Sequence, residues 1–345
     1  ILIGLSWVYI AFGEMPLVAG LFYGIKPAVT AIVLQAAHRI GSRTLTSPGL
    51  WALALASLLA IGLFNVPFPA IVAVAALVGY VWGRWAPGAF KSGGGHAASG
   101  KRFGPALIDD DTPTPEHARF RWSRLAKVLV AAAVLWLVPM GALVSTVGWG
   151  HTLTQMGWFF SKAALLTFGG AYAVLPFVTQ AAVMQYGWLS ATQMMDGLAL
   201  CESTPGPLII VVAFVGFIGG HSQALLGNPL LGGIAAACVV TWFTFLPSFV
   251  FILAGGPLVE ATRHMPSLAG PLQGITAAVI GVVLHLAGVF AYATWWPQGW
   301  PQSPDFSAIA LTAVAAWLLI GKQRSVMQVL GLCAGVGWML SGVRH

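Results

Sequence analysis

Long apolar runs recur along almost the whole chain, separated by short polar or aromatic stretches. Each run covers about 16–25 residues, the length that an α-helix needs to cross a hydrocarbon core of ~30 Å. The runs lack the strict alternation of polar and apolar residues that membrane-spanning β-strands require. The pattern predicts an all-α, polytopic helical membrane protein with about 11 spans, at 1–13, 16–38, 49–64, 66–84, 126–147, 157–182, 205–220, 230–254, 267–292, 307–321 and 326–341.

One hydrophilic segment, residues 85–125, interrupts the apolar runs. It contains KSGGGHAASGKR and DDDTPTPE, and such Gly-, Ser-, Pro- and charge-rich sequences cannot bury a core. We expect a flexible linker here. It divides the chain into the C-terminal part of a first domain at 1–84 and a second domain at 148–345, with a connecting transmembrane helix at 126–147.

Composition supports the membrane class. Hydrophobic residues make up 58% of the chain and charged residues 7%, against about 25% charged in a typical soluble domain. The three cysteines are scattered, without a CxxC spacing or a nearby His, so they indicate neither a metal site nor a disulfide framework. We expect no metal and no cofactor.

The positive charges predict an orientation, because short loops rich in Lys and Arg stay in the cytoplasm. The net charge of +7 is therefore a topology signal, which excludes a nucleic-acid partner and leaves the lipid bilayer as the surroundings. We expect the linker 85–125 to be cytoplasmic. The basic connections carry Arg39 and Arg43, eight Lys and Arg residues in and beside the linker, and Lys322 with Arg324, whereas the connections 65–69, 145–155 and 294–302 carry none.

The chain contains an internal repeat. MPLVAGLFYGIKPAVTAIVL (15–34) aligns without a gap to MPSLAGPLQGITAAVIGVVL (265–284), with ten of twenty positions identical. The charge pattern sends the first copy from outside to inside and the second from inside to outside, so the two homologous halves have inverted topology, as in many secondary transporters. Both copies keep a pair of glycines four residues apart, which predicts close helix packing. The repeat also predicts that about 95 residues of the first half precede the sequence given.

The segment LLTFGGAYAVLPF (165–177) weakens its own helix. Gly169, Gly170 and Pro176 free backbone groups that lipid cannot satisfy, so this backbone must face protein or a wet cavity. Lys162 adds a cation at membrane depth, and Thr167 and Tyr172 add hydroxyls. Together these groups predict an anion-binding site.

A second break follows in CESTPGPLII, where Pro205, Gly206 and Pro207 open an apolar helix. Ser203 or Thr204 is expected to cap that helix, whose N-terminus would offer N–H groups to an anion. Glu202 is a candidate for proton coupling, because a carboxylate repels an anion unless it is protonated or paired with Lys162.

Several of these residues also have structural explanations. Glycine in a membrane helix often serves packing, and the prolines at 205 and 207 also suit a simple helix start. Lys162 could snorkel to the interface, whereas Lys26 lies deeper and is the stronger intramembrane charge. His285 is expected in the core, and Glu14, Asp196, Glu260 and Arg263 in solvated loops.

The motifs TFGGAYAVLP (167–176), YGWLS (186–190), ESTPGPL (202–208) and VGFIGG (215–220) resemble the second domain of the chromate ion transporter (CHR) family, and residues 5–43 are similar to the later part of its first domain. The resemblance implies a bacterial inner-membrane protein that exports chromate. It implies that chromate or a related oxyanion binds near Lys162, Thr167, Gly169, Gly170, Tyr172, Thr204, Gly206 and Lys26. The first-domain FGG and PGP motifs of the family are absent from the sequence given.

Other functions are less well supported. The same fold could carry sulfate, molybdate or another tetrahedral dianion, and the sequence alone does not exclude a channel. An intramembrane enzyme would need a cluster of acids, bases or nucleophiles, but the nine acidic residues are isolated apart from the DDD of the linker. We therefore expect no enzymatic activity. The sequence leaves the oligomeric state open, a homo-oligomer included.

Overall fold

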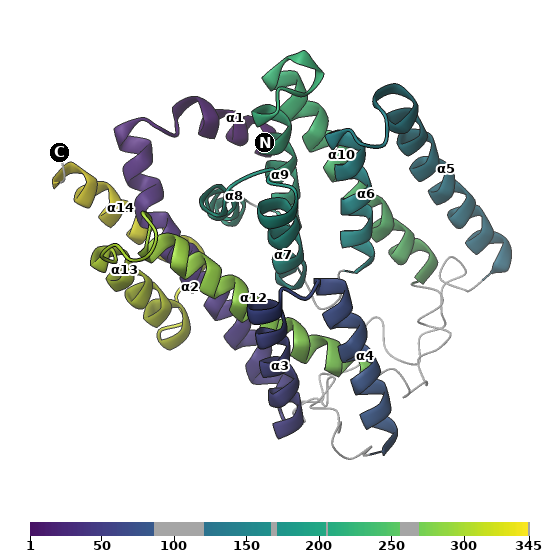
Figure 1. The fold of residues 1–345 in the computed structure, drawn as a ribbon, viewed down its shortest axis with the longest axis horizontal. Coiled ribbons are helices and arrows are strands. Elements are labelled where there is room, and N and C mark those ends of the chain that lie inside the picture. Colours follow the sequence, from purple (N-terminus) through teal and green to yellow (C-terminus); the bar gives the residue numbers. More distant parts are fainter. Residues whose placement is uncertain (86–120, 167–170, 205, 256–268, 344–345) are drawn as a thin grey trace, which may run out of the picture.

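The computed structural model describes residues 1–85, 121–166, 171–204, 206–255 and 269–343 (Figure 1). Every regular element in these ranges is helical. Short π turns (η2, η5 and η7) and 3₁₀ turns (η3 and η4) extend or join the α-helices. The elements are α1 (Leu2–Phe12), α2 (Pro16–Thr44), α3 (Pro48–Phe64), α4 (Phe68–Trp85), α5 (Trp122–Val147), α6 (Thr152–Leu165), α7 (Ala171–Thr179), η2 (Gln180–Gln185), α8 (Ala191–Ser203), η3 (Leu208–Ile210), α9 (Val211–Ser222), η4 (Leu225–Gly227), α10 (Pro229–Val250), η5 (Phe251–Gly255), α12 (Ala269–Trp295), α13 (Phe306–Ala316), η7 (Trp317–Gly321) and α14 (Val326–Val343).

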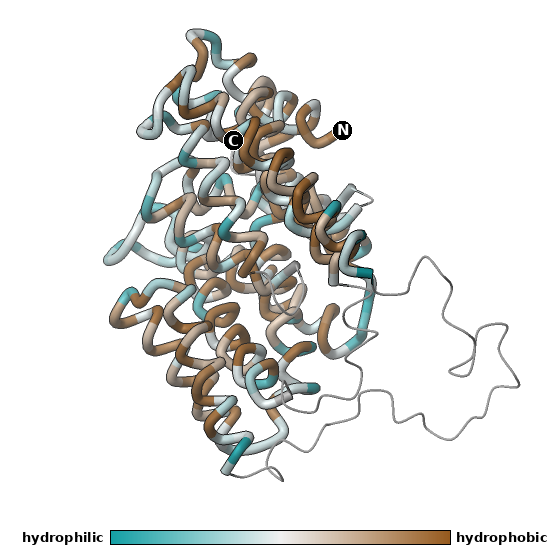
Figure 2. The backbone as a smooth tube through the Cα atoms, turned by 90° about the vertical axis from the view of Figure 1, so that its right-hand side faces the viewer, coloured by the Kyte–Doolittle hydropathy of each residue, from teal (hydrophilic) through white to brown (hydrophobic). Residues whose placement is uncertain are grey.

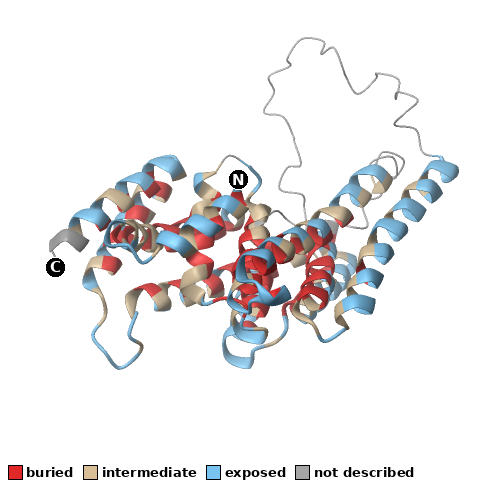
Figure 3. Cartoon of the chain, turned by 90° about the horizontal axis from the view of Figure 1, so that it is seen from above, coloured by how far each residue is buried: buried red, intermediate tan, exposed pale blue. Residues whose placement is uncertain are grey.

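The surface of this bundle is apolar, as a protein surrounded by lipid requires. Hydrophobic residues predominate along the helices in Figure 2. The outer helix α5 is mostly exposed in Figure 3, and it presents Val130 and Val138, each 64% exposed. Among the described residues, five helices are long and apolar enough to cross a membrane, namely Pro16–Thr44, Phe68–Trp85, Trp122–Val147, Pro229–Gly255 and Gly270–Trp295.

The two halves of the repeat interlock. The long helix α2 packs against α13 and α14, whereas the long helix α12 packs against α3 and α4. Each long helix therefore lies against the helical hairpin of the other half, and α2 and α12 also contact each other near the centre of Figure 1. The shared core consists of side chains from both halves, such as Val29 and Val282, which are buried.

Small residues make these helix contacts close, as the repeat predicts. A Cβ atom on Gly24 would overlap the carbonyl of Cys333 in α14, and one on Gly274 would overlap the carbonyl of Ala75 in α4. Because lipid supplies no hydrophobic drive between helices, close van der Waals packing of this kind is a main source of association. The prediction for both glycine pairs is confirmed.

The two helical hairpins also have the same local structure. Asn65 ends α3 in the left-handed conformation at φ 50°, and Gln323 takes φ 51° at the corresponding turn between α13 and α14. Ser47 caps α3, and Asp305 caps α13 through the N–H groups of Ser307 and Ala308. Equivalent turns and caps at equivalent places support a true duplication.

The copies run in opposite directions through the bundle. Arg39 and Arg43 at the end of α2 line the same cavity as Arg324, which lies two residues before the start of α14. We call this end of the bundle the basic face. Helix α2 leads toward the basic face. Helix α12 leads away from it to the start of α13, where the Asp305 N–H donates to the Trp295 carbonyl. The two copies of the repeat are therefore inverted.

One predicted span is wrong. Residues 157–182 do not form a single broken helix, because α6 ends at Leu165 and the chain folds back. A helix that the sequence pattern did not predict, α8, covers Ala191–Ser203. The linker expected at 85–125 falls mostly outside the described residues.

Candidate functional site

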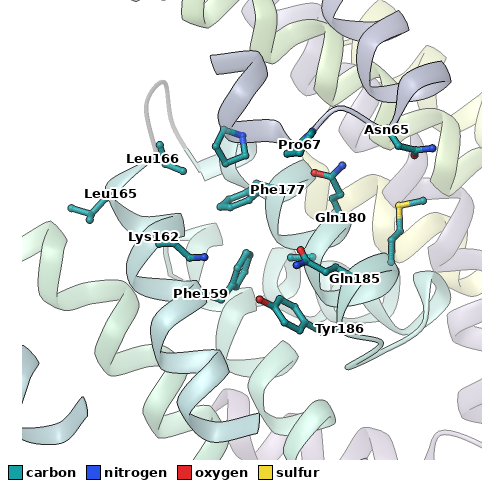
Figure 4. Close-up of a pocket in the computed structure, with 13 residues that line it drawn as sticks. Asn65, Pro67, Phe159, Lys162, Leu165, Leu166, Phe177, Gln180, Gln185 and Tyr186 are labelled. Atoms are coloured by element: carbon teal, nitrogen blue, oxygen red, sulfur yellow. The ribbon is translucent and has the colours of Figure 1, made fainter. Parts of the chain in front are cut away.

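Helices α6 and α7 form a hairpin rather than one span. Phe159 lies six residues before the end of α6, and Phe177 lies six residues after the start of α7. Their ring centroids are 5.0 Å apart, and Figure 4 shows the two rings on facing arms of the hairpin. With 14 residues, α6 is ~21 Å long at 1.5 Å per residue, too short to cross a ~30 Å core. An arm of this length is typical of a re-entrant hairpin, which membrane proteins tolerate where its backbone is covered by protein or water.

The segment between α6 and α7 contains the first predicted set of anion-binding groups. Thr167, Gly169 and Gly170 belong to it and lie outside the described residues. Pro176 lies inside α7, where it has no N–H to donate to the carbonyl of Tyr172 four residues earlier. The sequence correctly placed a break here, but it did not show that the chain reverses direction.

The second break separates α8 from η3 and α9. The expected N-cap is wrong, because Ser203 donates its hydroxyl to the Leu200 carbonyl at 2.9 Å, behind it in α8. Thr204 likewise donates to the carbonyls of Leu200 and Cys201 at 3.1 and 3.0 Å and ends α8. Gly206 and Pro207 lie exposed between the helices, and Pro205 is outside the described residues. The hydroxyls of Ser203 and Thr204 therefore satisfy carbonyls at the end of α8, not N–H groups at the start of the next helix.

A hydrogen bond joins the two broken elements. The Tyr172 hydroxyl, near the start of α7, donates to Oε1 of Glu202, near the end of α8. Glu202 therefore pairs with Tyr172, whereas the sequence pointed to Lys162 as its partner. Tyr172 belongs to the pair α6 and α7, and Glu202 belongs to the pair α8 and α9. This hydrogen bond therefore holds the break between α6 and α7 against the break between α8 and α9.

Lys162 lies on α6 at the edge of a large pocket of about 700 Å³. Figure 4 shows Lys162 beside Phe159 on one side of the pocket, with Gln180, Gln185 and Tyr186 on the other. Its ammonium also lies 5.6 Å from the centre of the Trp158 ring. The residues that line this pocket do not include Tyr172, so Lys162 and Tyr172 belong to different cavities.

Lys26 does not face either cavity as a free charge. Its Nζ lies 3.7 Å from Oδ2 of Asp196, whose side chain is 4% exposed, and the Tyr9 hydroxyl donates to the same oxygen at 2.8 Å. The expectation that Asp196 occupies a solvated loop is wrong, because this residue is buried in α8. Oδ1 of Asp196 has no hydrogen-bond partner among the described residues.

A cavity that the sequence did not predict lies at the basic face. Its volume is about 490 Å³, and Arg39, Arg43 and Arg324 line it together with Tyr172. Gln35, Thr44 and Ser325 add polar groups. The spacing of Gln35, Arg39 and Arg43 puts them on one face of a helix, which is the sequence signal for this cavity, although the same arginines also mark the cytoplasmic end of the span.

The part of the chain that the structure describes has no cluster of three His, Cys, Asp or Glu residues that could hold a metal ion. Cys201 and Cys333 are buried free thiols and Cys238 is an exposed one. His285 is half-buried rather than fully in the core, and it lines a small pocket beside Ile61. The chemistry of the described site is thus that of arginine, lysine, hydroxyl and carboxylate groups.

Comparison with known sequences identifies similar proteins. The sequence model described as chromate transporter matches residues 1–80 and 154–338. A chromate transport protein of Cupriavidus metallidurans is 27% identical over 289 residues, which cover 84% of this chain and 60% of that protein. A chromate transport protein of Pseudomonas aeruginosa is 32% identical over 351 residues, covering 99% of this chain and 71% of that protein.

The chain spans only part of the length of these curated relatives, 60% in the case of the Cupriavidus protein. No solved structure matches it.

Proposed function

Because the chain belongs to the chromate transporter family, we propose that it carries chromate outward across the inner membrane of a bacterium and so confers chromate resistance. The protein acts as a secondary transporter and not as an enzyme. Its basic face lies in the cytoplasm with the linker 85–125, where positively charged loops are retained. The relatives that are named as chromate transport proteins support this proposal.

The hydrogen bond between Tyr172 and Glu202 is the observation that carries the proposal for the site. It brings together two helical pairs, each broken within the bundle, and such breaks are where secondary transporters hold their substrates. We place the substrate between these breaks, near Tyr172, Thr204 and Gly206, and we assign Thr167, Gly169 and Gly170 of the segment between α6 and α7 to the same site. Lys162 supplies positive charge from the neighbouring pocket, whereas the charge of Lys26 is balanced by Asp196.

The membrane potential alone can drive export of a dianion. A potential that is negative inside contributes about 2.3 kcal/mol per charge per 100 mV, so two charges gain roughly 4–5 kcal/mol per 100 mV on leaving the cell. Coupling to protons is therefore not required for export. If coupling exists, Glu202 is the carboxylate placed to provide it, because its partner Tyr172 borders the cavity at the basic face.

Sulfate or another tetrahedral oxyanion is the alternative substrate. Chromate and sulfate share shape and charge, and the arginine, lysine and hydroxyl groups of this region recognise both features without distinguishing between the two ions.

Transport of radiolabelled chromate into everted vesicles tests the proposal, with the full-length protein and with sulfate as competitor. We expect accumulation that rises with an inside-positive potential in these everted vesicles. A lack of chromate accumulation in wild type would refute the proposed function. Lys162→Ala should lower the rate, and undiminished transport in this variant would remove Lys162 from the site.

A further inference from the structure

The cavity at the basic face collects positive charge from both halves of the molecule. Arg39 and Arg43 come from the last turns of α2, and Arg324 comes from the turn between α13 and α14. Tyr172 of α7 lines the same cavity. Residues that lie far apart in the sequence thus meet around one hollow of about 490 Å³.

The lining groups are donors that suit an oxyanion. Arginine presents a planar fork of N–H groups that matches the oxygens of phosphate-like anions in bidentate fashion. Gln35 and Ser325 add an amide and a hydroxyl, and α14 begins at Val326 on the cavity wall, with the positive end of its dipole there. The described residues that line the cavity include no Asp or Glu.

Simple explanations account for part of this arrangement. Positive residues gather on the cytoplasmic side of membrane proteins, and an arginine in the last turn of a helix interacts favourably with the helix dipole. Neither effect requires three arginines to surround one cavity. Arg39 and Arg43 are four residues apart on one helix, where like charges repel, and Arg324 adds a third positive charge. A bound dianion would relieve this repulsion.

We propose that this cavity is the site that first binds a tetrahedral oxyanion from the cytoplasm, before the ion passes Tyr172 and reaches the helix breaks. This inference rests on the proposed function, and it assigns to Arg39, Arg43 and Arg324 the role of substrate capture. The ligand class is a divalent tetrahedral oxyanion, sulfate as well as chromate. Since both halves of the repeat contribute arginines, the complete site exists only where the two halves meet.

Substitution in the full-length protein tests this role through the concentration dependence of transport in everted vesicles, whose outer surface is the cytoplasmic face. Arg39→Gln and Arg324→Gln should each raise KM for chromate about tenfold, with a smaller effect on the rate at saturation. Arg39→Lys keeps the charge without the fork and should give an intermediate KM. The matched control is Lys322→Gln, which removes the same charge two residues from Arg324, at a side chain that contacts Trp317 rather than the cavity.

Three outcomes distinguish the explanations. If wild type transports chromate and the arginine variants keep the wild-type KM, the capture site is refuted while the proposed function stands. If Lys322→Gln raises KM as much as Arg324→Gln, general surface charge accounts for the effect and the capture site is refuted. Wild type that does not transport chromate refutes the proposed function instead.

A measurement on the unmutated protein covers the case in which a variant does not insert. Phenylglyoxal modifies accessible arginines, and mass spectrometry reports the extent of modification at each position. Sulfate should slow the modification of Arg39 and Arg324 several-fold, and leave Arg84, which bonds Tyr80 on α4, unchanged. Equal modification of Arg39 with and without sulfate would contradict binding at the cavity.

Discussion

The long helix α2 carries positive charge at two places that differ in how that charge is balanced. Lys26, in the middle of the helix, is paired with the buried carboxylate of Asp196. Arg39 and Arg43, at its end, line a cavity whose described lining contains no carboxylate. The first charge is satisfied within the protein, and the second pair is left for a ligand.

The difference follows from depth in the bundle. An unpaired charge surrounded by protein and lipid is costly, so Lys26 needs a partner and finds it on α8, across the contact between the two halves. Arginines at the basic face keep contact with water and need no fixed partner. A cation within a transporter is therefore not by itself a substrate site, because its neighbours decide whether it is available to a ligand.

The largest expected effect comes from breaking the internal pair. Lys26→Met would leave Asp196 as an unpaired carboxylate in a buried position and should destabilise the protein by about 3–5 kcal/mol. Thermal unfolding of the detergent-purified protein checks this. The matched control is the double variant Lys26→Met with Asp196→Asn, which removes both charges and should recover most of the loss. A double variant no more stable than Lys26→Met would argue against the pair.

A smaller loss is expected on removing the hydrogen bond between Tyr172 and Glu202, which lies between the cavity and the helix breaks. Tyr172→Phe removes the hydroxyl that donates to Glu202, a hydrogen bond to a charged group worth about 1.5–3 kcal/mol. Chromate transport should fall about tenfold or more if this bond holds the substrate region together. Tyr186→Phe, which removes a hydroxyl at the Lys162 pocket, is the matched control and should keep a rate close to wild type. Equal losses in both variants would assign no special role to Tyr172.

Binding of sulfate should separate the two charged places directly. An anion that binds the folded state stabilises it by about 1.4 kcal/mol at ten times Kd, a rise in Tm of roughly 2 °C. At the same sulfate concentration the stabilisation should fall to about 0.4 kcal/mol in Arg39→Gln, whose affinity is about tenfold weaker, and it should persist in the double variant of Lys26 and Asp196. Loss of the shift in the double variant alone would contradict binding at the arginine cavity and place the ligand at the buried pair.

The smallest effect concerns salt. Added sodium chloride should weaken sulfate binding at the open arginine cavity several-fold, because exposed charges are screened at Debye lengths of about 10 Å at 0.1 M and 3 Å at 1 M. The pair of Lys26 and Asp196 is partly shielded by protein, so the stability lost in Lys26→Met should change little over the same range. Sulfate titrations and unfolding curves at several salt concentrations measure the two responses.

Much of the fold could be predicted because it depends on local properties. The free energy of transferring apolar side chains into lipid is a sum over the residues of one segment. Hydropathy therefore predicts the long helices such as α2 and α12. Glycine and proline act on the backbone where they stand, so the breaks near Gly169 and Pro205 were also expected. The repeat was visible because its two copies still share residues at half of the aligned positions.

The membrane class, the duplication and the positions of the helix breaks were thus determined by the sequence itself, and its motifs pointed to the family. Only the tertiary structure decided that α6 and α7 fold back on each other, since that depends on packing such as the Phe159 and Phe177 contact. It also decided that Lys26 pairs with Asp196 and that three arginines share a cavity. The physical reason is that a partner brought close by folding can lie anywhere along the chain, whereas periodicity and hydropathy describe only neighbours in sequence.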